Sequence, residues 1–394
     1  MKIIIFGLIY GTGGIQTHIS WLTKALLESG GEVLIITPTV PNRQIISWLK
    51  SQGLNSDRLN IVSLGSSKDK VDTIFSTYLK LFQSIRKFAP DVFFCVGTGW
   101  NMSLISLFLP QKTRKIFHEV MSGKTYSEKD PRWVIKYLFD DVFAQASDVG
   151  KNFSETFHWQ KKIPVLPAFP EPLEITAQLP TAKQKTVPLG KAKAALFSRL
   201  APHKQAFWLV QQWDFLKDYL GELHIHGGGI EEDLIREYIQ EKGIGDRVKC
   251  FGRYPDGQAY VDLLGSYDLT LLPTIGAEGS PLVLLESMAC GVPFVAYGVG
   301  GIPDYGIDNP DVTVVPPEPW LTQQAREYTT TSAKGEIKAF LEGVKLITEK
   351  LSKEKINQAR LQQFYFAHYS YEVLKKLWFS YLYNCSERSP YKNK

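Results

Sequence analysis

The chain has 394 residues, of which 44% are hydrophobic and 22% are charged. This balance is typical of a globular protein and excludes a disordered or fibrous chain. The length exceeds what one hydrophobic core fills, so we expect two domains. The net charge of +5 is uneven, because residues 1–165 hold 20 lysines and arginines against 13 aspartates and glutamates. Such a basic half either attracts an anionic membrane or an acidic acceptor, or is an ordinary solvated surface.

The four cysteines lie far apart, which predicts neither a disulfide framework nor a zinc site. Met1 leads directly into an apolar strand, without the pattern of a signal peptide. No apolar run approaches the roughly 20 residues that a membrane-spanning helix needs. The expected location is therefore cytoplasmic, with peripheral contact on the inner face of the membrane as a hypothesis.

The first 165 residues alternate short β-branched runs with amphipathic helical stretches. The predicted strands are 2–6, 32–37, 60–64, 91–96, 115–118 and 142–144, and the predicted helices are 15–28, 44–51 and 71–88. This alternation implies a parallel sheet covered by helices on both faces. Residues 1–165 are therefore predicted to form one doubly wound, Rossmann-like domain.

Six prolines between Ile163 and Lys193 interrupt the alternation, so 166–192 is predicted to be a linker. The alternation then resumes, which predicts a second doubly wound domain over 193–368. Its predicted strands are 194–197, 223–226, 247–251, 269–272, 294–296 and 312–315.

The end of the chain is different, because residues 334–384 are predicted to be almost wholly helical. The final segment, 369–394, carries an apolar stripe at helical spacing that needs a surface to cover. The stripe consists of Leu374, Leu377, Trp378, Tyr381 and Leu382. Residues 389–394 are expected to be frayed.

The loop after the first strand, residues 7–15, is rich in glycine and reads GLIYGTGGI. Glycines let a backbone approach a ligand, and a helix start offers N–H groups to an anion. A dinucleotide site would need a third glycine and an acidic residue after the second strand, but that strand ends in Thr37-Pro38. An anion-binding loop, a dinucleotide site and a glycine turn without a ligand stay open at this point.

A second loop, residues 274–293, reads TIGAEGSPLVLLESMACGVP. A helix is predicted to begin near Pro281, where the N–H groups of residues 280–283 and the helix dipole suit a diphosphate. Glu286 lies within this nearly apolar helix, and a buried carboxylate needs a partner such as a ribose hydroxyl. Glu278 can reach a sugar beyond the diphosphate. The alternative is an amphipathic helix with a stray glutamate.

Glu278 and Glu286, separated by seven residues, resemble the signature of the retaining group 1 glycosyltransferases. The resemblance implies that Glu278 contacts hydroxyls of a donor sugar and that Glu286 binds the ribose of its nucleotide. The other donor-binding residues implied around the helix start are Gly279, Ser280, Pro281, Leu282 and Val283.

Residues 197–204, FSRLAPHK, resemble the arginine and lysine pair of the same family. Arg199 and Lys204 are thereby implied to neutralise the donor's diphosphate as the leaving group gains negative charge. Gln205 stands where the family usually has glycine, which puts the backbone of this loop in doubt. By the same resemblance Gly227 lies beneath the nucleotide, and Arg253 lies where the base is held.

Two histidines near this turn, His224 and His226, are poor candidates for a metal site, because a strand's i and i+2 residues give two ligands without a third. In the first domain, Gly13 and Gly14 resemble the family's glycine loop near the donor phosphates and the acceptor. His118 resembles its histidine beside the reacting sugar and is predicted to be catalytic with Arg199, Lys204 and Glu278; the alternative is a satisfied core or surface histidine.

The resemblance implies the GT-B architecture, in which two Rossmann-like domains face each other across a cleft and the C-terminal helix crosses back to the first domain. The implied activity is transfer of a hexose-type sugar, with retention, from a nucleoside diphosphate donor, a UDP-sugar being favoured. The acceptor is a hydroxyl of a cell-surface glycan, a lipid-linked compound or a small molecule. The implied front-face mechanism uses neither a protein nucleophile nor a metal, and no cofactor or nucleic-acid partner is expected.

Three other functions stay open. A nucleotide-sugar epimerase or hydrolase of the same fold would turn over its donor without an acceptor. A dinucleotide-dependent oxidoreductase would bind nicotinamide cofactors. A catalytically silent binding protein is disfavoured by the complete set of Arg199, Lys204, Glu278 and Glu286.

Overall fold

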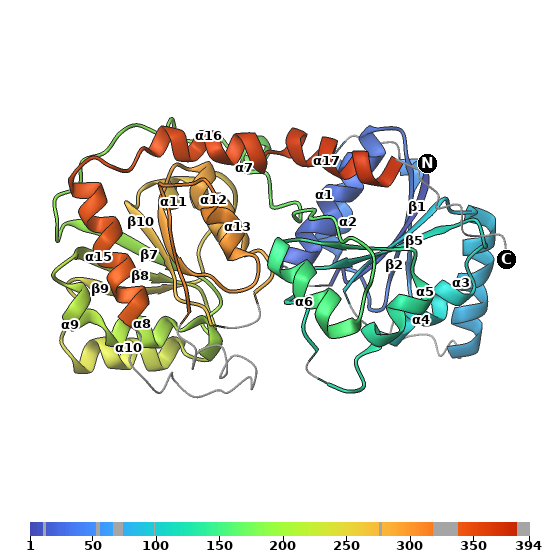
Figure 1. The fold of residues 1–394 in the computed structure, drawn as a ribbon, viewed down its shortest axis with the longest axis horizontal. Coiled ribbons are helices and arrows are strands. Elements are labelled where there is room, and N and C mark those ends of the chain that lie inside the picture. The colour runs from blue at the N-terminus through green and yellow to red at the C-terminus, as the bar shows by residue number, and fades with distance from the viewer. Residues whose placement is uncertain are drawn as a thin grey trace. The chain divides into compact units, whose positions relative to one another are not determined.

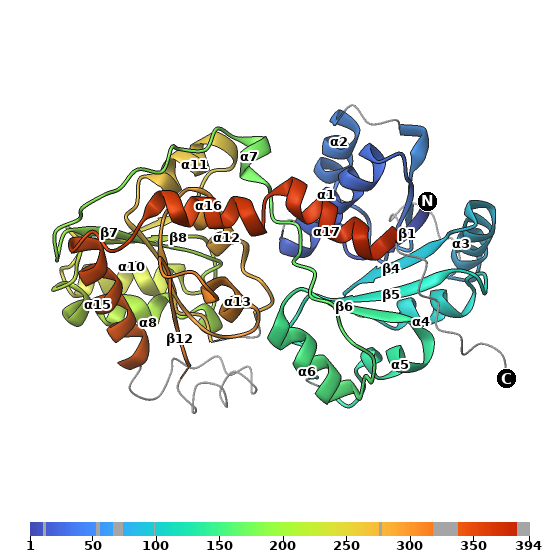
Figure 2. The same ribbon diagram turned by 45° about the horizontal axis from the view of Figure 1, so that its top comes forward.

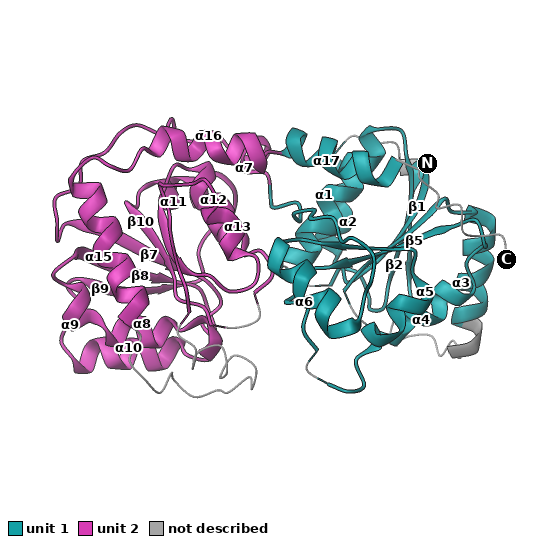
Figure 3. Ribbon diagram, in the orientation of Figure 1, with its two compact units in different colours: residues 1–171, 371–394 teal, residues 172–370 magenta. Residues whose placement is uncertain are grey.

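The computed structural model describes residues 1–10, 13–52, 56–65, 74–97, 99–125, 127–275, 278–317 and 338–383 (Figure 1). The chain forms two compact units (Figure 3). Unit 1 comprises Met1–Glu171 and Tyr371–Lys394, and unit 2 comprises Pro172–Ser370. The division after Glu171 falls inside the stretch that the sequence predicts to be a linker.

Unit 1 is built on a parallel six-stranded sheet with the order β3-β2-β1-β4-β5-β6. Figure 2 shows β4, β5 and β6 side by side. The strands are β1 (Lys2–Phe6), β2 (Glu32–Thr37), β3 (Leu59–Ser63), β4 (Val92–Val96), β5 (Arg114–Glu119) and β6 (Asp141–Ala144). The strands at the centre of the sheet are buried on both faces, because they consist largely of β-branched and aromatic residues.

Helices cover both faces of this sheet. The cores of the two faces show that α1, α2 and α17 cover one face and that α3, α4, α5 and α6 cover the other. The helices of unit 1 are α1 (Gly14–Glu28), α2 (Arg43–Ser51), η1 (Ser56–Arg58), α3 (Ile74–Phe88), α4 (Trp100–Leu107), η2 (Pro131–Val134), α5 (Ile135–Leu138), α6 (Ser147–Phe157) and α17 (Tyr371–Tyr383).

The last helix, α17, packs into the core of unit 1. Leu374, Trp378 and Leu382 of the predicted stripe are buried there beside residues of β1 and α1. Leu377 is half-buried, whereas Tyr381 is 37% exposed and lies at the margin of the stripe. The indole N–H of Trp378 donates a 2.9 Å hydrogen bond to the carbonyl of Pro167.

Unit 2 repeats the same design, with a parallel six-stranded sheet in the order β12-β11-β10-β7-β8-β9. The strands are β7 (Ala192–Phe197), β8 (Leu220–His226), β9 (Val248–Gly252), β10 (Leu269–Leu272), β11 (Phe294–Tyr297) and β12 (Thr313–Val315). The helices are α7 (Leu173–Thr176), η3 (Pro202–Lys204), α8 (Ala206–Gln211), α9 (Trp213–Leu216), α10 (Glu232–Glu241), α11 (Gly257–Gly265), α12 (Leu282–Ala289), α13 (Ile302–Gly306), α15 (Lys338–Ser352) and α16 (Gln358–His368).

The predicted fold class is confirmed, because each half is a doubly wound parallel sheet and every predicted strand forms within three residues of its predicted bounds. The helical prediction for 334–384 is confirmed over the described part, as α15, α16 and α17. Residues 71–73, 334–337, 384 and 389–394 lie outside the described residues. None of the described helices is both long enough and apolar enough to span a membrane.

Candidate functional site

The predicted donor residues of unit 2 lie where its strand order reverses. β7 and β10 are neighbours in the sheet. The strands that follow β7 in sequence are added on one side of this pair, and those that follow β10 are added on the other side. Open parallel sheets bind ligands at such a point, beyond the carboxyl ends of the strands. The loop after β7 carries Arg199 and Lys204, and the loop after β10 carries Glu278. The structure therefore brings the predicted diphosphate and sugar residues to one edge of one sheet.

An ion pair joins these two loops. Lys204 Nζ pairs with Glu278 Oε1, and the side chains are 16% and 13% exposed. The hydroxyl of Thr274 donates a 2.8 Å hydrogen bond to the same carboxylate oxygen. Burial raises the pKa of Glu278, but the charge of Lys204 and the hydrogen bonds from Lys204 and Thr274 outweigh it, so the pKa lies below its ordinary value. Glu278 is therefore ionised at neutral pH and can only accept hydrogen bonds.

Arg199 adds a second cation at this edge. Its side chain is exposed, and no ion pair of Arg199 occurs among the described residues. Burial lowers the pKa of the neighbouring His203, and the charges of Lys204 and Arg199 lower it further against the opposing charge of Glu278. His203 is therefore neutral at neutral pH. Arg199, Lys204 and Glu278 together leave an excess positive charge, which suits an anionic ligand.

Two glycines allow the loops to pack at this edge. Gly227 has a φ of +137°, and a Cβ there would lie 1.7 Å from the carbonyl oxygen of Ser198. Gly300 has a φ of +61°, and a Cβ there would lie 1.7 Å from the carbonyl oxygen of Glu278. Any other residue at either place would push the loop away. Gly300 is not among the residues predicted from the sequence, although it lies in a glycine-rich turn after β11 that could have indicated it.

Gln205 adopts a left-handed conformation, with a φ of +58°. This is the position where the resemblance expects glycine, and the left-handed conformation explains that preference. The side chain of Gln205 is buried and donates a 2.6 Å hydrogen bond to the carbonyl of Pro202. The loop thus keeps the glycine-type backbone in spite of the substitution.

Helix α12 begins at Leu282, one residue later than predicted, with Pro281 at the cap position. Proline has no backbone N–H, so the prediction that all of residues 280–283 offer donors is corrected. The amides at this helix start belong to Ser280, Leu282 and Val283, and these three residues are half-buried. With the helix dipole they form a place for negative charge near Glu278.

Glu286 is half-buried on the next turn of α12 and is bound by a tyrosine. The hydroxyl of Tyr260, a buried residue of α11, donates a 2.6 Å hydrogen bond to Glu286 Oε2. This bond fixes the direction in which the carboxylate points. Tyr260 is not among the residues predicted from the sequence, because it lies 26 residues before Glu286 and belongs to no local motif.

Aromatic rings continue the site towards β9. Tyr254 stacks on Tyr260 with ring centroids 5.2 Å apart and meets Phe197 edge-on at 5.3 Å. Burial, followed by the charge of Glu286, raises the pKa of Tyr254 to about 12, so its hydroxyl stays protonated. Arg253 is exposed beside these rings. The place predicted for the nucleobase therefore combines the aromatic ring of Tyr254 with the cation of Arg253.

The two histidines at the end of β8 are engaged in a hydrogen-bond network. His224 Nδ1 and His226 Nε2 lie 3.0 Å and 2.7 Å from the hydroxyl oxygen of Tyr267. Burial lowers the pKa of both histidines, that of His226 to about 4. No group of three metal-ligating side chains occurs in the described part of the chain.

In unit 1, the glycine loop precedes α1. Gly14 is the first residue of the helix, Gly13 occupies the cap position, and both are exposed. The side-chain amide of Gln16 donates a 2.8 Å hydrogen bond to the carbonyl of Tyr10 and so closes the turn. Ile15 and Gln16, which follow in the first turn of α1, are half-buried, while Gly11 and Thr12 lie outside the described residues.

The structure places His118 in the core of unit 1, with its side chain fully buried. Its Nε2 lies 3.2 Å from the carbonyl oxygen of Leu166, and its ring meets those of His18 and Trp378 at centroid distances of 5.0 and 4.9 Å. Burial lowers the pKa of His118 to about 3. This position is that of a neutral core histidine, so the predicted contact with a sugar has no support from the placement. The catalytic role of His118 stays a prediction.

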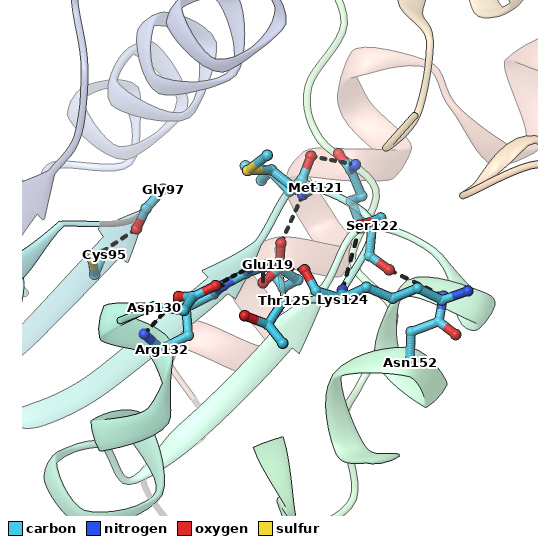
Figure 4. A network of polar contacts seen from close by, with 12 residues as sticks. Cys95, Gly97, Glu119, Met121, Ser122, Lys124, Thr125, Asp130, Arg132 and Asn152 are labelled. Carbon is cyan, nitrogen blue, oxygen red and sulfur yellow. Dashed lines mark hydrogen bonds and ion pairs between the residues drawn. The ribbon is translucent and has the colours of Figure 1, made fainter. Parts of the chain in front are cut away.

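A buried ionic cluster follows β5 (Figure 4). Arg132 forms hydrogen-bonded ion pairs with Glu119 at 2.8 Å and with Asp130 at 2.6 Å, and all three side chains are under a tenth exposed. The guanidinium of Arg132 also donates to the carbonyl of Lys124 at 2.7 Å, and the amide of Met121 donates to Glu119 at 2.8 Å. Through these buried contacts, the cluster fixes the parts of the loop between β5 and η2 that contain Met121, Lys124 and Asp130.

Comparisons with known proteins agree with this arrangement. Residues 192–327, which include Arg199, Lys204, Glu278 and Glu286, match the family model described as glycosyl transferases group 1. The chain is 31% identical over 163 residues to the UDP-N-acetylglucosamine--peptide N-acetylglucosaminyltransferase GtfA subunit of Streptococcus gordonii, which covers 40% of this chain and 30% of that protein. It is 31% identical over 126 residues to a GDP-mannose-dependent alpha-(1-6)-phosphatidylinositol monomannoside mannosyltransferase of Mycolicibacterium smegmatis, which covers 30% of this chain and 33% of that protein.

The whole fold also has solved counterparts. The crystal structure of Anabaena Alr3699/HepE in complex with UDP and glucose superposes with a TM-score of 0.69 over 98% of this chain and 100% of that one, at 14% identity. At this identity the likeness shows the fold alone. The chain spans only 11% to 33% of the length of the five curated relatives that it matches. The chain therefore has the GT-B fold, and residues 192–327 of its second unit match the group 1 glycosyltransferases.

Proposed function

We propose that the chain transfers a hexose-type sugar from a nucleoside diphosphate donor to a hydroxyl acceptor, with retention of the anomeric configuration. The observation that carries this proposal is the edge where β7 and β10 meet, which combines two cations, an ionised carboxylate and the start of α12. A nucleoside diphosphate sugar needs these three partners, for its diphosphate, its sugar hydroxyls and its developing negative charge.

In the proposed mechanism, Arg199, Lys204 and the amides at the start of α12 bind the diphosphate. As the bond from the anomeric carbon to the diphosphate oxygen breaks, these groups stabilise the charge that the leaving oxygen gains. The acceptor hydroxyl forms the new bond on the same face of the sugar and gives its proton to that oxygen. The step needs no protein nucleophile, and the two cations take the part that a metal ion plays in other transferases.

The remaining roles concern the donor. Glu278 accepts hydrogen bonds from sugar hydroxyls, and Lys204 keeps it ionised for this purpose. Glu286 accepts from the ribose in the direction that Tyr260 gives it. Arg253 and the ring of Tyr254 hold the base, and Gly227 lets the chain pass close beneath the nucleotide. For Gly13 and Gly14 of unit 1, the role near the donor phosphates and the acceptor stays a prediction from the sequence resemblance.

UDP is the first candidate for the nucleotide. The relative from Streptococcus gordonii is described as using UDP-N-acetylglucosamine, and the solved structure of HepE contains UDP. The relative from Mycolicibacterium smegmatis is described as dependent on GDP-mannose. The acceptor is a hydroxyl of a cell-surface glycan, a lipid-linked compound or a small molecule. The cytoplasmic location expected from the sequence stays a prediction.

The decisive experiment is a thermal-shift screen against UDP, GDP, ADP, CMP, dTDP and NAD, with and without EDTA. We expect one nucleoside diphosphate to raise the melting temperature by several degrees in both conditions, because a ligand that binds the folded state stabilises it. The shift should vanish in Glu286→Gln and persist in Glu241→Gln, a matched change at an exposed site of α10.

The chemistry is read by incubating the matching nucleotide sugar with candidate acceptors and recording the anomeric configuration of the product by NMR. Transfer with retention supports the proposal. Release or epimerisation of the sugar without an acceptor favours the epimerase or hydrolase alternative. A shift with NAD alone favours the oxidoreductase and contradicts the proposal.

A further inference from the structure

One face of unit 1 carries an apolar stripe on α4. Trp100, Leu104, Leu107 and Phe108 are spaced as i, i+4, i+7 and i+8 and therefore lie along one side of this helix. The opposite side, with Met102 and Ile105, fills the core beneath the sheet. On the stripe itself, the exposed fractions of the side chains are 59% for Trp100, 65% for Leu107 and 51% for Phe108. Large apolar side chains that are exposed together mark a surface for a partner.

The neighbouring helices extend this stripe. α3 packs against α4 through the rings of Phe82 and Phe108, whose centroids are 4.0 Å apart, and through a 2.7 Å hydrogen bond from Tyr78 to Asn101. α5 also contacts α4, and Figures 1 and 2 both show these helices together on unit 1. α5 adds Tyr137, which is 76% exposed. Aromatic side chains of this kind prefer the boundary between water and lipid.

The charged side chains within the helices around the stripe are all basic. No aspartate or glutamate occurs within α3, α4, η2 or α5. The bases at the surface of these helices and of the turn after α4 are Lys80, Arg86, Lys87, Lys112 and Lys136. The acids that follow α3 and α5 are Asp91, Asp140 and Asp141. Asp91 accepts a 2.7 Å hydrogen bond from the amide of Lys2, Asp140 accepts one of 2.9 Å from the amide of Lys115, and Asp141 pairs with Arg114 at 2.7 Å. Just before η2, Glu128 is adjacent to Lys129, so that pair adds no net charge.

We propose that this face of unit 1, formed by α3, α4 and α5, docks on the surface of a bilayer that contains anionic phospholipids. Lysines and arginines are attracted to the phosphate layer, and Trp100, Leu107, Phe108 and Tyr137 enter the boundary of the acyl chains. Helices that carry exposed aromatic residues and bases but no acids fit such a surface better than they fit a protein partner, whose surface mixes both signs of charge. The proposal does not depend on the proposed transfer reaction.

The test is sedimentation of the full chain with vesicles. We expect binding to vesicles of equal phosphatidylglycerol and phosphatidylcholine at about 0.05 M NaCl, weaker binding at about 0.5 M NaCl, and little binding to pure phosphatidylcholine. The double variant Trp100→Ser with Leu107→Ser should lower the lipid affinity about tenfold. Both side chains are mostly exposed, so these changes should leave folding intact.

Two matched controls make the result specific. Ile307→Ser with Leu346→Ser removes two exposed apolar side chains from unit 2 and should bind vesicles as wild type does. Lys112→Gln with Lys136→Gln should weaken binding at low salt and remove most of its salt dependence, whereas Lys242→Gln with Lys353→Gln in unit 2 should do neither. Nucleotide binding, read by thermal shift, should be unchanged in every variant and reports separately on the proposed function.

Three results would overturn the docking proposal. One is a wild-type chain that ignores anionic vesicles at low salt. Another is a Trp100 and Leu107 variant that binds them with wild-type affinity. The third is a wild-type dimer in light scattering that this variant converts to a monomer, because the face would then cover a second copy of the chain.

Discussion

The two units use the same sheet order, yet they place their charges at the carboxyl edge of the sheet in opposite ways. In unit 1, Glu119, Asp130 and Arg132 are buried and satisfy one another. In unit 2, Arg199 is exposed, and Lys204 and Glu278 form a pair that solvent still reaches. A charge that is fully paired inside a unit can only shape a loop, whereas a charge at the surface keeps the capacity to bind a ligand.

A second contrast lies between the buried histidines of unit 1 and the carboxylate of Glu286 in unit 2. In unit 1, His18 and His118 are buried beside Trp378, and burial lowers the pKa of both. In unit 2, the half-buried Glu286 is oriented by Tyr260 but still faces solvent in part. Polar residues at a sheet edge therefore do not suffice to mark a ligand site; the remaining exposure separates the two cases.

Breaking the buried cluster of unit 1 should have the largest effect. Arg132→Met leaves two buried carboxylates without their cation, and we expect it to destabilise unit 1 by about 3 to 5 kcal/mol. Lys2→Met, which removes an exposed pair with Glu32, should cost less than about 1 kcal/mol. Denaturant unfolding followed by hydrogen exchange of each unit measures both. Nucleotide binding in unit 2 should be unchanged. A fall of less than about 1 kcal/mol in the free energy of unfolding of Arg132→Met would show that the cluster does not hold the loop.

Breaking the pair of unit 2 should instead remove activity. Lys204→Ala and Glu278→Gln should each slow sugar transfer by about a hundredfold or more, because each removes a group that acts on developing charge or on the sugar. Lys242→Ala, an exposed lysine near the end of α10, serves as the control. Release of nucleoside diphosphate from the donor gives the rate. Rates within about threefold of wild type would remove either residue from the mechanism.

A smaller effect should follow from freeing Glu286. Tyr260→Phe removes the hydroxyl that donates to Glu286 and should weaken nucleoside diphosphate binding about five- to tenfold, because the carboxylate is then no longer held in its binding direction before the ligand arrives. Calorimetry against UDP, or the nucleotide found in the screen, measures this. With the 2′,3′-dideoxy nucleotide the difference should disappear, because the two changes then act on the same contact. An equal loss with both nucleotides would mean that Tyr260 does not act through the ribose.

The smallest effect should be found at Gln205. Gln205→Gly relieves a left-handed backbone but loses a buried side chain, so we expect a change in stability below about 1 kcal/mol. Gln205→Val cannot adopt this backbone easily and should destabilise unit 2 by about 2 kcal/mol. Thermal unfolding compares the two variants. Equal losses would show that the side chain of Gln205, and not its backbone, determines the loop.

The sequence by itself determined the parts of this protein that depend on near neighbours in the chain. The alternation of strands and helices, the division into two doubly wound halves and the spacing of Glu278 and Glu286 follow from local periodicity and short motifs. Such signals are reliable because strand and helix periods act over a few residues. The resemblance to the group 1 glycosyltransferases could be recognised for the same reason.

Only the tertiary structure decided which distant side chains meet. Tyr260 binds Glu286, His118 is sealed beneath Trp378, and Arg132 closes on Glu119, although in each pair the partners come from different elements. These contacts depend on how helices pack on a sheet, and no local pattern fixes that packing. Burial then helps to determine the protonation state of each group. The carboxylate of Glu278, beside Lys204 and near the surface, is ionised, whereas His118 in the core of unit 1 is neutral.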